Sequence, residues 1–274
     1  MHPAYPGRTM KPTAIVLLPI LIGCSTLLGV DVPEQKQMTM EAEAGGQQLE
    51  YWLYVPEATA TAEEGSVPFM LFLHGSGERG SDLDKVRTHG PPKLVGKMPD
   101  LDRFVVASPQ CPADQWWNPT TLKALIDEVL AAHPAIDRDR LTVTGLSMGG
   151  YATWNLLASY PDLFAAAAPI CGGGDPNRLW REKNPERVVE SAFDLGRLEA
   201  AKDVPIWAFH GDKDEAVPLG ESQLVVDALT AAGAKHVKLT VYPGVGHDSW
   251  TQTYENPELY TWLLAQKKGA PPQD

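Results

Sequence analysis

Short apolar runs and stretches with helix-like spacing of apolar residues follow one another along most of this sequence. Segments rich in apolar residues predict strands over residues 68–73, 104–107, 141–144, 164–170, 204–209 and 237–242. The segments 68–73 and 104–107 are continuously apolar, as expected of strands that are covered on both faces. Apolar positions three and four residues apart predict helices over residues 120–133, 151–158, 220–232 and 255–266. This repeated alternation favours an α/β fold with a mainly parallel, doubly wound sheet.

Two further strands are predicted near the N-terminus, over residues 38–43 and 49–55. The Gly-containing segment 44–47 between them predicts a hairpin turn. We therefore expect the parallel sheet to carry an antiparallel edge.

The flanking segments predict a single globular domain. Residues 25–37 have the composition of a polar tether and residues 269–274 that of a disordered tail, which leaves a domain over residues 38–268. Residues 172–203 exceed what a plain crossover needs, and we expect a small lid or binding loop there. Its bulky or charged residues include Arg178, Trp180 and Arg181.

The first 24 residues have the features of an export signal. Arg8 and Lys11 precede an apolar run over residues 14–22, which is too short to span a bilayer. The run ends in Leu21-Ile22-Gly23-Cys24, which is similar to a bacterial lipobox, so we predict lipidation of Cys24. The alternative is an ordinary secretory signal with an incidental cysteine. The expected location is periplasmic or membrane-anchored, or else secreted.

The net charge and the cysteines limit which binding partners and which compartment are expected. The formal net charge of −12 over 274 residues argues against nucleic acid or an anionic membrane surface as the main partner. Membrane contact is expected only through a lipid on Cys24, and the oligomeric state stays open. Cys111 and Cys171 each follow a predicted strand, and either a disulfide or two separately buried thiols fit an oxidising compartment.

A candidate nucleophile follows the predicted strand 141–144. The stretch Gly145-Leu146-Ser147-Met148-Gly149-Gly150 is a G-x-S-x-G motif, and a helix-like run follows it. A strand, a tight turn and a helix around such a serine form a nucleophile elbow. The motif alone is weak, because chance produces it in roughly one such chain in a dozen. In this context Ser147 is the candidate nucleophile, and the amide of Met148 is placed to stabilise negative charge.

A base and an acid are expected at the ends of other strands. His247 lies in a glycine-flanked loop after the last predicted strand, and Asp214 follows the strand 204–209. These residues would accept the serine proton and orient the imidazole. Asp212 is the rival acid and Glu215 a poorer one. A metal site made of His210, Asp212 and Asp214 is disfavoured, because no metal-like clustering occurs elsewhere.

The Gly-rich stretch 74–80 follows the first buried strand and predicts the second oxyanion donor, most simply the amide of Ser76. Within it, Arg79 either binds a substrate carboxylate or pairs with Glu78, and the ion pair is favoured. Trp116, Trp117 and Trp250 lie on loops at the same strand ends and could form an aromatic wall for an acyl or aryl group. For Trp116 and Trp117, ordinary loop packing has equal weight.

The order Ser147, Asp214, His247 is that of α/β-hydrolases. The chain from Glu50 to about Gln266 resembles this superfamily, and more narrowly bacterial carboxylesterases of the phospholipase/carboxylesterase and dienelactone-hydrolase type, often labelled predicted peptidases. The stretches that carry the resemblance are residues 74–80, Ser108-Pro109-Gln110-Cys111-Pro112, residues 145–150 and Gly246-His247-Asp248. The resemblance implies an acyl-serine intermediate, no metal and no organic cofactor. It also implies an acid four residues after the histidine of a His-Gly pair, which selects Asp214.

The favoured function is that of a serine carboxylesterase acting on small or polysaccharide-linked esters. No long apolar lid is evident, which argues against an interfacial lipase. A serine peptidase with the same triad is the first alternative, although such chains usually carry an access-restricting domain that is not evident here. A non-catalytic binding protein on a hydrolase scaffold is the second alternative.

Overall fold

The structure is a computed structural model that describes residues 34–41, 48–178, 193 and 195–273. Several sequence predictions lie outside these residues: the export signal and Cys24, most of the tether, the turn at residues 44–47, and Trp180 and Arg181 of the predicted lid. Within the described part, no helix is long and apolar enough to cross a bilayer.

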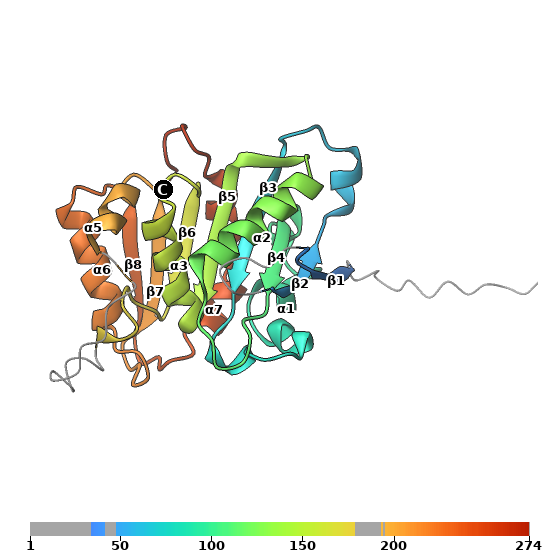
Figure 1. The fold of residues 1–274 in the computed structure, drawn as a ribbon. Coiled ribbons are helices and arrows are strands. Elements are labelled where there is room, and N and C mark those ends of the chain that lie inside the picture. Colours follow the sequence, from blue (N-terminus) through green and yellow to red (C-terminus); the bar gives the residue numbers. More distant parts are fainter. Residues whose placement is uncertain (1–33, 42–47, 179–192, 194, 274) are drawn as a thin grey trace, which may run out of the picture. The chain divides into compact units, whose positions relative to one another are not determined.

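Eight strands form one sheet in the order β1-β2-β4-β3-β5-β6-β7-β8 (Figure 1). The strands are β1 (Gln35–Thr39), β2 (Glu50–Tyr54), β3 (Val67–Leu73), β4 (Val105–Pro109), β5 (Ile136–Leu146), β6 (Ala166–Ile170), β7 (Ile206–Gly211) and β8 (Val237–Tyr242). The pairs β1–β2 and β2–β4 are antiparallel, and all other neighbours are parallel. This confirms the predicted α/β fold with an antiparallel N-terminal edge.

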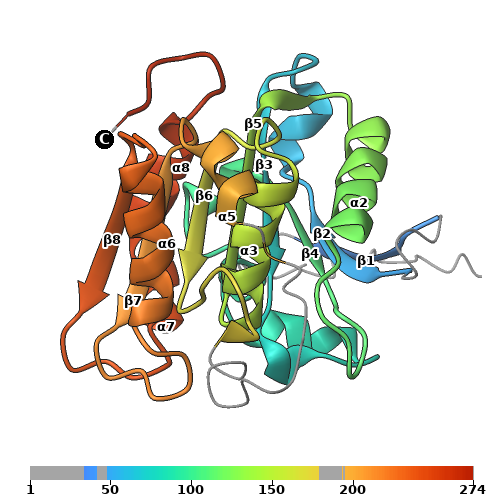
Figure 2. The ribbon, with the colours of Figure 1, turned by 60° about the vertical axis from the view of Figure 1, so that its left-hand side comes forward.

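Helices cover both faces of the sheet (Figures 1 and 2). The α-helices are α1 (Pro91–Leu94), α2 (Pro119–Ala132), α3 (Met148–Ser159), α5 (Leu195–Leu198), α6 (Gly220–Ala231), α7 (Trp250–Glu255) and α8 (Pro257–Ala265). Short 3₁₀ turns are η1 (Glu57–Thr61), η2 (Ser76–Glu78), η3 (Leu83–Thr88), η4 (Leu101–Arg103) and η5 (Glu199–Ala201). Helices α2, α3 and α6 pack on one face, and α7 and α8 on the other.

The central strand β3 shows why its sequence is continuously apolar. Leu71 and Leu73 join the core under α2 and α3, whereas Met70 and Phe72 join the core under α8. Successive side chains of a strand point to opposite faces, so a strand covered on both sides needs apolar residues at every position.

The closing helix predicted over residues 255–266 is confirmed as α8, and a short helix that was not predicted, α7, comes directly before it. The chain forms two helices, α7 and α8, with Asn256 between them. Pro257 has no N–H to continue a helix, and the Asn256 side chain accepts a hydrogen bond from the N–H of Glu258 (3.0 Å). The break leaves Trp250 and the rest of α7 close to the loop that carries His247.

Candidate active site

Ser147 lies at the sharp turn between β5 and α3. Its backbone has φ 52° and ψ −113°, a left-handed conformation that is strained for a residue with a side chain. Its N–H donates to the carbonyl of Ile170 (2.9 Å). A Cβ at Gly149 would lie 1.9 Å from the carbonyl oxygen of Leu73, so only glycine lets α3 approach β3 this closely. The G-x-S-x-G stretch is therefore an elbow, as predicted.

Three strand ends bring Ser147, His247 and Asp214 together. His247 Nε2 lies 2.9 Å from Ser147 Oγ, and His247 Nδ1 lies 2.7 Å from Asp214 Oδ2. The His247 side chain is 27% exposed and that of Asp214 is 0% exposed. Solvent therefore reaches the imidazole while the carboxylate stays buried behind it.

Asp214 is held from several directions. Its Oδ1 accepts the backbone N–H groups of Ala216 (2.9 Å) and Val217 (2.8 Å). Burial opposes ionisation, but the hydrogen bonds from His210, His247 and the Val217 amide outweigh it. The pKa of the Asp214 carboxyl therefore lies well below its usual range. Asp214 is an anion at any working pH.

Asp212 and Glu215, the two other candidates for the acid of the triad, lie at the surface. Asp212 is exposed, and its Oδ1 accepts the N–H of Gly244 (2.7 Å). Glu215 is exposed as well. Of the three carboxylates in this loop, the structure brings Asp214 to His247.

The loop after β3 lies against the serine. A Cβ built on Gly75 would be 3.6 Å from the Cβ of Ser147. The loop is anchored by His74, whose buried ring donates from Nδ1 to the Gly75 carbonyl (2.6 Å) and accepts the Cys111 N–H at Nε2 (2.9 Å). Burial lowers the pKa of His74 to about 4, so the ring is neutral.

The three predicted aromatic residues have different environments. Trp117 is 6% exposed, and its Nε1 donates to the carbonyl of His74 (3.2 Å), which favours the packing interpretation. Trp116 is 50% exposed and meets Tyr151 edge to face (6.4 Å between ring centroids). Trp250 meets the ring of His247 edge to face (5.3 Å). Trp250 thus lies beside the imidazole of His247, and Trp116 is the more exposed of the two adjacent tryptophans.

The ion pair between Arg79 and Glu78, which the sequence favoured, is not formed. Arg79 donates instead to the carbonyls of Ser76 and Gln115 (both 3.1 Å), which ties the loop after β3 to the segment before α2. Glu78 lies 3.9 Å from His74 Nδ1 and 3.8 Å from His89 Nε2.

Cys111 and Cys171 are both buried free thiols, the second of the two alternatives left open above. Burial raises the pKa of Cys111 to about 12 and that of Cys171 further still. Potential ligand atoms of Cys171, Asp214 and His247 lie within 4.8 Å of one another. The carboxylate and imidazole are already hydrogen-bonded to each other and the thiol holds its proton, so we assign no metal ligands here.

Sequence reasoning missed two contacts of the site. His210, considered only as a metal ligand, lies 3.3 Å from Asp214 Oδ2. His74, considered only as part of a Gly-rich loop, holds that loop to residue 111. One signal was present: a His-Gly pair ends both β3 and β7.

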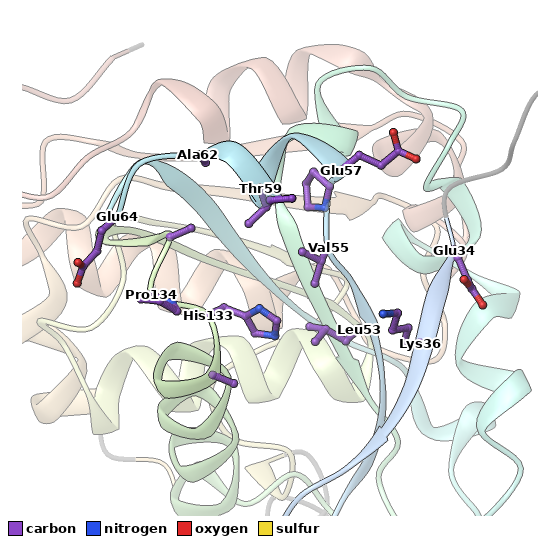
Figure 3. Close-up of a pocket in the computed structure, with 14 residues that line it drawn as sticks. Glu34, Lys36, Leu53, Val55, Glu57, Thr59, Ala62, Glu64, His133 and Pro134 are labelled. Atoms are coloured by element: carbon purple, nitrogen blue, oxygen red, sulfur yellow. The ribbon is translucent and has the colours of Figure 1, made fainter.

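A separate groove of about 570 Å³ lies among β2, η1 and the C-terminal end of α2 (Figure 3). Leu53, Val55 and His133 line it, and Glu57 and Glu64 lie near its edges. Ser147, Asp214 and His247 are not among its lining residues. The groove is therefore distinct from the site at the carboxyl ends of the strands.

Comparison with known proteins identifies the family. Residues 122–268, more than half of the chain, match the model of the prolyl oligopeptidase family. The chain belongs to the prolyl oligopeptidase family. This match includes Ser147, Asp214 and His247. The family and the relatives described next have the α/β-hydrolase fold, and the chain is similar to hydrolases of the dienelactone-hydrolase and carboxylesterase type.

Relatives from this family and fold include esterases and peptidases. A crystallised thermostable esterase is 32% identical, with a TM-score of 0.67 over 86% of this chain and 64% of that one. A putative carboxymethylenebutenolidase of Escherichia coli is 33% identical over 114 residues, which is 40% of this chain and 37% of the relative. The acylaminoacyl peptidase of Pyrococcus horikoshii, at 19% identity and a TM-score of 0.65, covers 88% of this chain and 43% of its own; it shares the fold.

A poly(3-hydroxyalkanoate) depolymerase C of Paucimonas lemoignei is 49% identical over 53 residues, only 19% of this chain and 13% of the relative. The chain thus spans well under two thirds of the length of these curated relatives.

Proposed function

We propose that this serine hydrolase is a carboxylesterase that cleaves small or polysaccharide-linked carboxylic esters through an acyl-serine intermediate. In this proposal Ser147 is the nucleophile, His247 the general base and Asp214 the residue that orients the base. The observation that carries it is the unbroken row of hydrogen bonds from Asp214 Oδ2 to His247 Nδ1 (2.7 Å) and from His247 Nε2 to Ser147 Oγ (2.9 Å).

The row of hydrogen bonds supplies both proton transfers. Ser147 Oγ attacks the ester carbonyl while its proton moves to His247 Nε2. His247 then gives this proton to the leaving alkoxide, and the acyl group remains on Ser147. In the second half, water gives a proton to His247 and attacks the acyl-serine, which releases the acid and restores the serine. Asp214 stays ionised and stabilises the imidazolium.

The oxyanion is held in this proposal by the backbone N–H groups of Met148 and Ser76. Met148 is the first residue of α3, so its N–H has no partner within the helix, and the helix terminus favours negative charge. Ser76 follows Gly75, where a Cβ would lie 3.6 Å from the Cβ of Ser147, and this closeness of the loop supports the Ser76 amide as the second donor. The exposed face of Trp116 and the ring of Trp250 offer an aromatic surface for the acyl or aryl group.

A serine peptidase with the same triad is the second candidate, and the family match favours it. The two reactions differ in the leaving group, an alcohol or an amine, which His247 protonates in either case. The 32% identity to a thermostable esterase over most of this chain supports the carboxylesterase as the first candidate. A non-catalytic binding protein is disfavoured because all three triad positions are filled and in contact.

The test is hydrolysis of p-nitrophenyl acetate and butyrate by the wild type and by Ser147→Ala. Loss of the nucleophile should lower kcat by about 10⁴- to 10⁶-fold. Ser66→Ala, in an exposed turn, is the matched control and should keep wild-type activity. Activity retained in Ser147→Ala, or no labelling of Ser147 by a fluorophosphonate, contradicts the proposal. A p-nitroanilide turned over faster than the matching ester would select the peptidase.

We also propose that residues 1–24 direct export, that the catalytic domain covers residues 38–268 and that Cys24 carries a lipid. The support is the charged, then apolar, then Cys-ending pattern of the N-terminus. Mass spectrometry of the mature N-terminus should find a lipid-modified Cys24. An unmodified first residue other than Cys24 would reject the anchor.

A further inference from the structure

His210, the next-to-last residue of β7, lies beside Asp214 and has no role in the mechanism proposed above. Its side chain is fully buried. Nδ1 lies 2.8 Å from Ser222 Oγ, while Nε2 lies 2.8 Å from the carbonyl oxygen of Val217 and 3.3 Å from Asp214 Oδ2. All of these partner atoms are oxygens. Which of them have a hydrogen to donate determines which nitrogens of the His210 ring are protonated.

At Nδ1, the count depends on the hydroxyl of Ser222. Ser222 Oγ also lies 2.7 Å from the carbonyl oxygen of Gly172. A carbonyl oxygen only accepts, so the single hydroxyl hydrogen of Ser222 points to Gly172. Ser222 Oγ therefore accepts from His210, and Nδ1 carries a hydrogen.

At Nε2, both neighbours accept. The Val217 carbonyl and the Asp214 carboxylate have no hydrogen to offer, so Nε2 carries one as well. Either neutral tautomer would leave one close, buried pair of acceptors with no hydrogen between them, which is costly away from water. Hydrogens on both ring nitrogens satisfy every contact.

We infer that His210 is a positioning residue that carries a hydrogen on each ring nitrogen, pairs as an imidazolium with the Asp214 carboxylate, and fixes that carboxylate toward His247. The inference rests on the proposed function, in which Asp214 orients His247. Two histidines then converge on Asp214 Oδ2, while backbone N–H groups hold Oδ1.

Other charged and titratable groups around His210 leave this pair intact. Glu221, next to Ser222 on α6, is buried and paired with Arg178. Cys171 after β6 and Tyr151 on α3 both have a pKa raised by burial, and they stay neutral. From the loop after β7, the side chain of Asp212 is exposed and bonded to the Gly244 amide. Among the described residues, Asp214 is thus the unneutralised anion that His210 contacts.

A cation on one side of Asp214 affects the histidine on the other side. It weakens the attraction between the carboxylate and the imidazolium that forms on His247 during catalysis. Without the cation, Asp214 would act on His247 alone and favour its protonated form. On acidification, His247 would then become protonated, and stop acting as a base, at a higher pH than in the wild type.

The first test counts hydrogens directly, by one-bond ¹⁵N–¹H correlation on wild-type protein labelled with ¹⁵N-histidine at neutral pH. His210, assigned through contacts to Ser222, should show a hydrogen on both ring nitrogens. His74 is the internal control: it is equally buried, but its Nε2 accepts an N–H, so it should show one hydrogen. One hydrogen on His210 overturns the inference. This measurement uses no catalysis, so it decides the matter even if the proposed esterase activity fails.

The second test is the pH dependence of kcat/KM for His210→Gln, which keeps an N–H donor and removes the charge. The acidic limb should move to higher pH by about one unit, and kcat should fall by about 10- to 100-fold. His236→Gln, at the opposite end of the β7–β8 pair, is the control and should keep the wild-type profile. A uniform loss with an unmoved limb means a structural role only. If the wild type cleaves no ester, it is the proposed function that fails.

Discussion

A His-Gly pair lies at the carboxyl end of both β3 and β7, His74-Gly75 just after β3 and His210-Gly211 as the last two residues of β7, and both histidines are fully buried. His74 accepts a backbone N–H, so it is a neutral ring whose pKa burial lowers to about 4. His210 meets only oxygens, which calls for hydrogens on both nitrogens. The same buried dipeptide therefore holds a neutral ring at His74 and, by our inference, an imidazolium at His210, because the atoms around the two rings differ.

The two loops are also built differently. The loop after β3 is tied to other segments through His74, Trp117 and Arg79, largely by bonds to backbone groups. The loop after β7 closes on its own carboxylate, Asp214, which takes two amides of the same loop. We therefore expect acid to destabilise the loop after β3, and we expect loss of the Asp214 carboxylate to impair the site formed by the loop after β7.

The largest effect should come from Asp214→Asn. The amide cannot stabilise the imidazolium and favours the wrong tautomer of His247, so kcat should fall by about 10⁴-fold. Asp212→Asn, two residues away and exposed, is the matched control and should stay close to wild type. Ester hydrolysis with far-UV circular dichroism as a check of folding measures both. Equal losses in the two variants would contradict the assignment of the acid.

A second prediction concerns acid stability of the loop after β3. The folded-state pKa of His74, about 4, is below its ordinary 6.5, so the unfolded chain binds a proton more readily. The stabilisation is complete above pH 6.5 and is lost as the pH falls toward 4, by up to about 3 kcal/mol. Asp214, with its lowered pKa, acts in the same direction only below its ordinary 3.8. Urea unfolding between pH 7 and 4.5 measures the loss.

The control for that loss is His74→Gln. It should be less stable at neutral pH but should lose clearly less on acidification. Equal pH slopes in the wild type and the variant would show that His74 is not the responsible group.

A third prediction compares the two glycines. A Cβ at Gly211 would lie 2.2 Å from the carbonyl oxygen of Val245, in the loop of His247, and backbone cannot yield easily. A Cβ at Gly75 would lie 2.8 Å from Leu146 Cδ1, the movable end of a side chain. Gly211→Ala should cost about 1–3 kcal/mol of unfolding free energy and Gly75→Ala less. Chemical denaturation compares them, and the reverse order would contradict the difference between the loops.

The smallest effect is expected from Trp117→Phe, which removes the hydrogen bond to the His74 carbonyl and should cost about 1 kcal/mol. Trp207→Phe is its counterpart on β7, where Nε1 donates to the Thr240 hydroxyl (2.8 Å). Thermal unfolding should show similar losses, while kcat should fall only in Trp117→Phe, because His74 supports the loop beside Ser147. A fall in kcat in both would point to general loosening.

The sequence was sufficient for the fold because parallel strands leave a regular signal. A continuous apolar run predicted β3, strand-like apolar segments predicted the other parallel strands, and the carboxyl ends of parallel strands share one sheet edge. Ser147, Asp214 and His247 could therefore be expected to lie near one another. The elbow, with its glycines and flanking elements, was readable for the same local reasons.

The environments of individual side chains depend on contacts between segments that are distant in the sequence, and such contacts cannot be predicted from one sequence. Trp116 and Trp117 are adjacent, yet one is exposed and the other donates to a carbonyl of β3's loop. The role of His210 depends on Ser222 and Gly172, from two other elements. The start of the last helix was different: Asn256-Pro257 is a local signal for a helix N-terminus, and α8 begins there.

The backbone of Ser147, at φ 52°, has a consequence for engineering. The left-handed conformation costs a residue with a side chain about 1–2 kcal/mol, and glycine does not bear that cost. Ser147→Gly should therefore have a higher melting temperature than Ser147→Ala. An inactive variant could then stay folded at a temperature that unfolds the active protein. Selection for thermal tolerance alone would tend to erase the nucleophile, so screens on this scaffold need turnover as a second criterion.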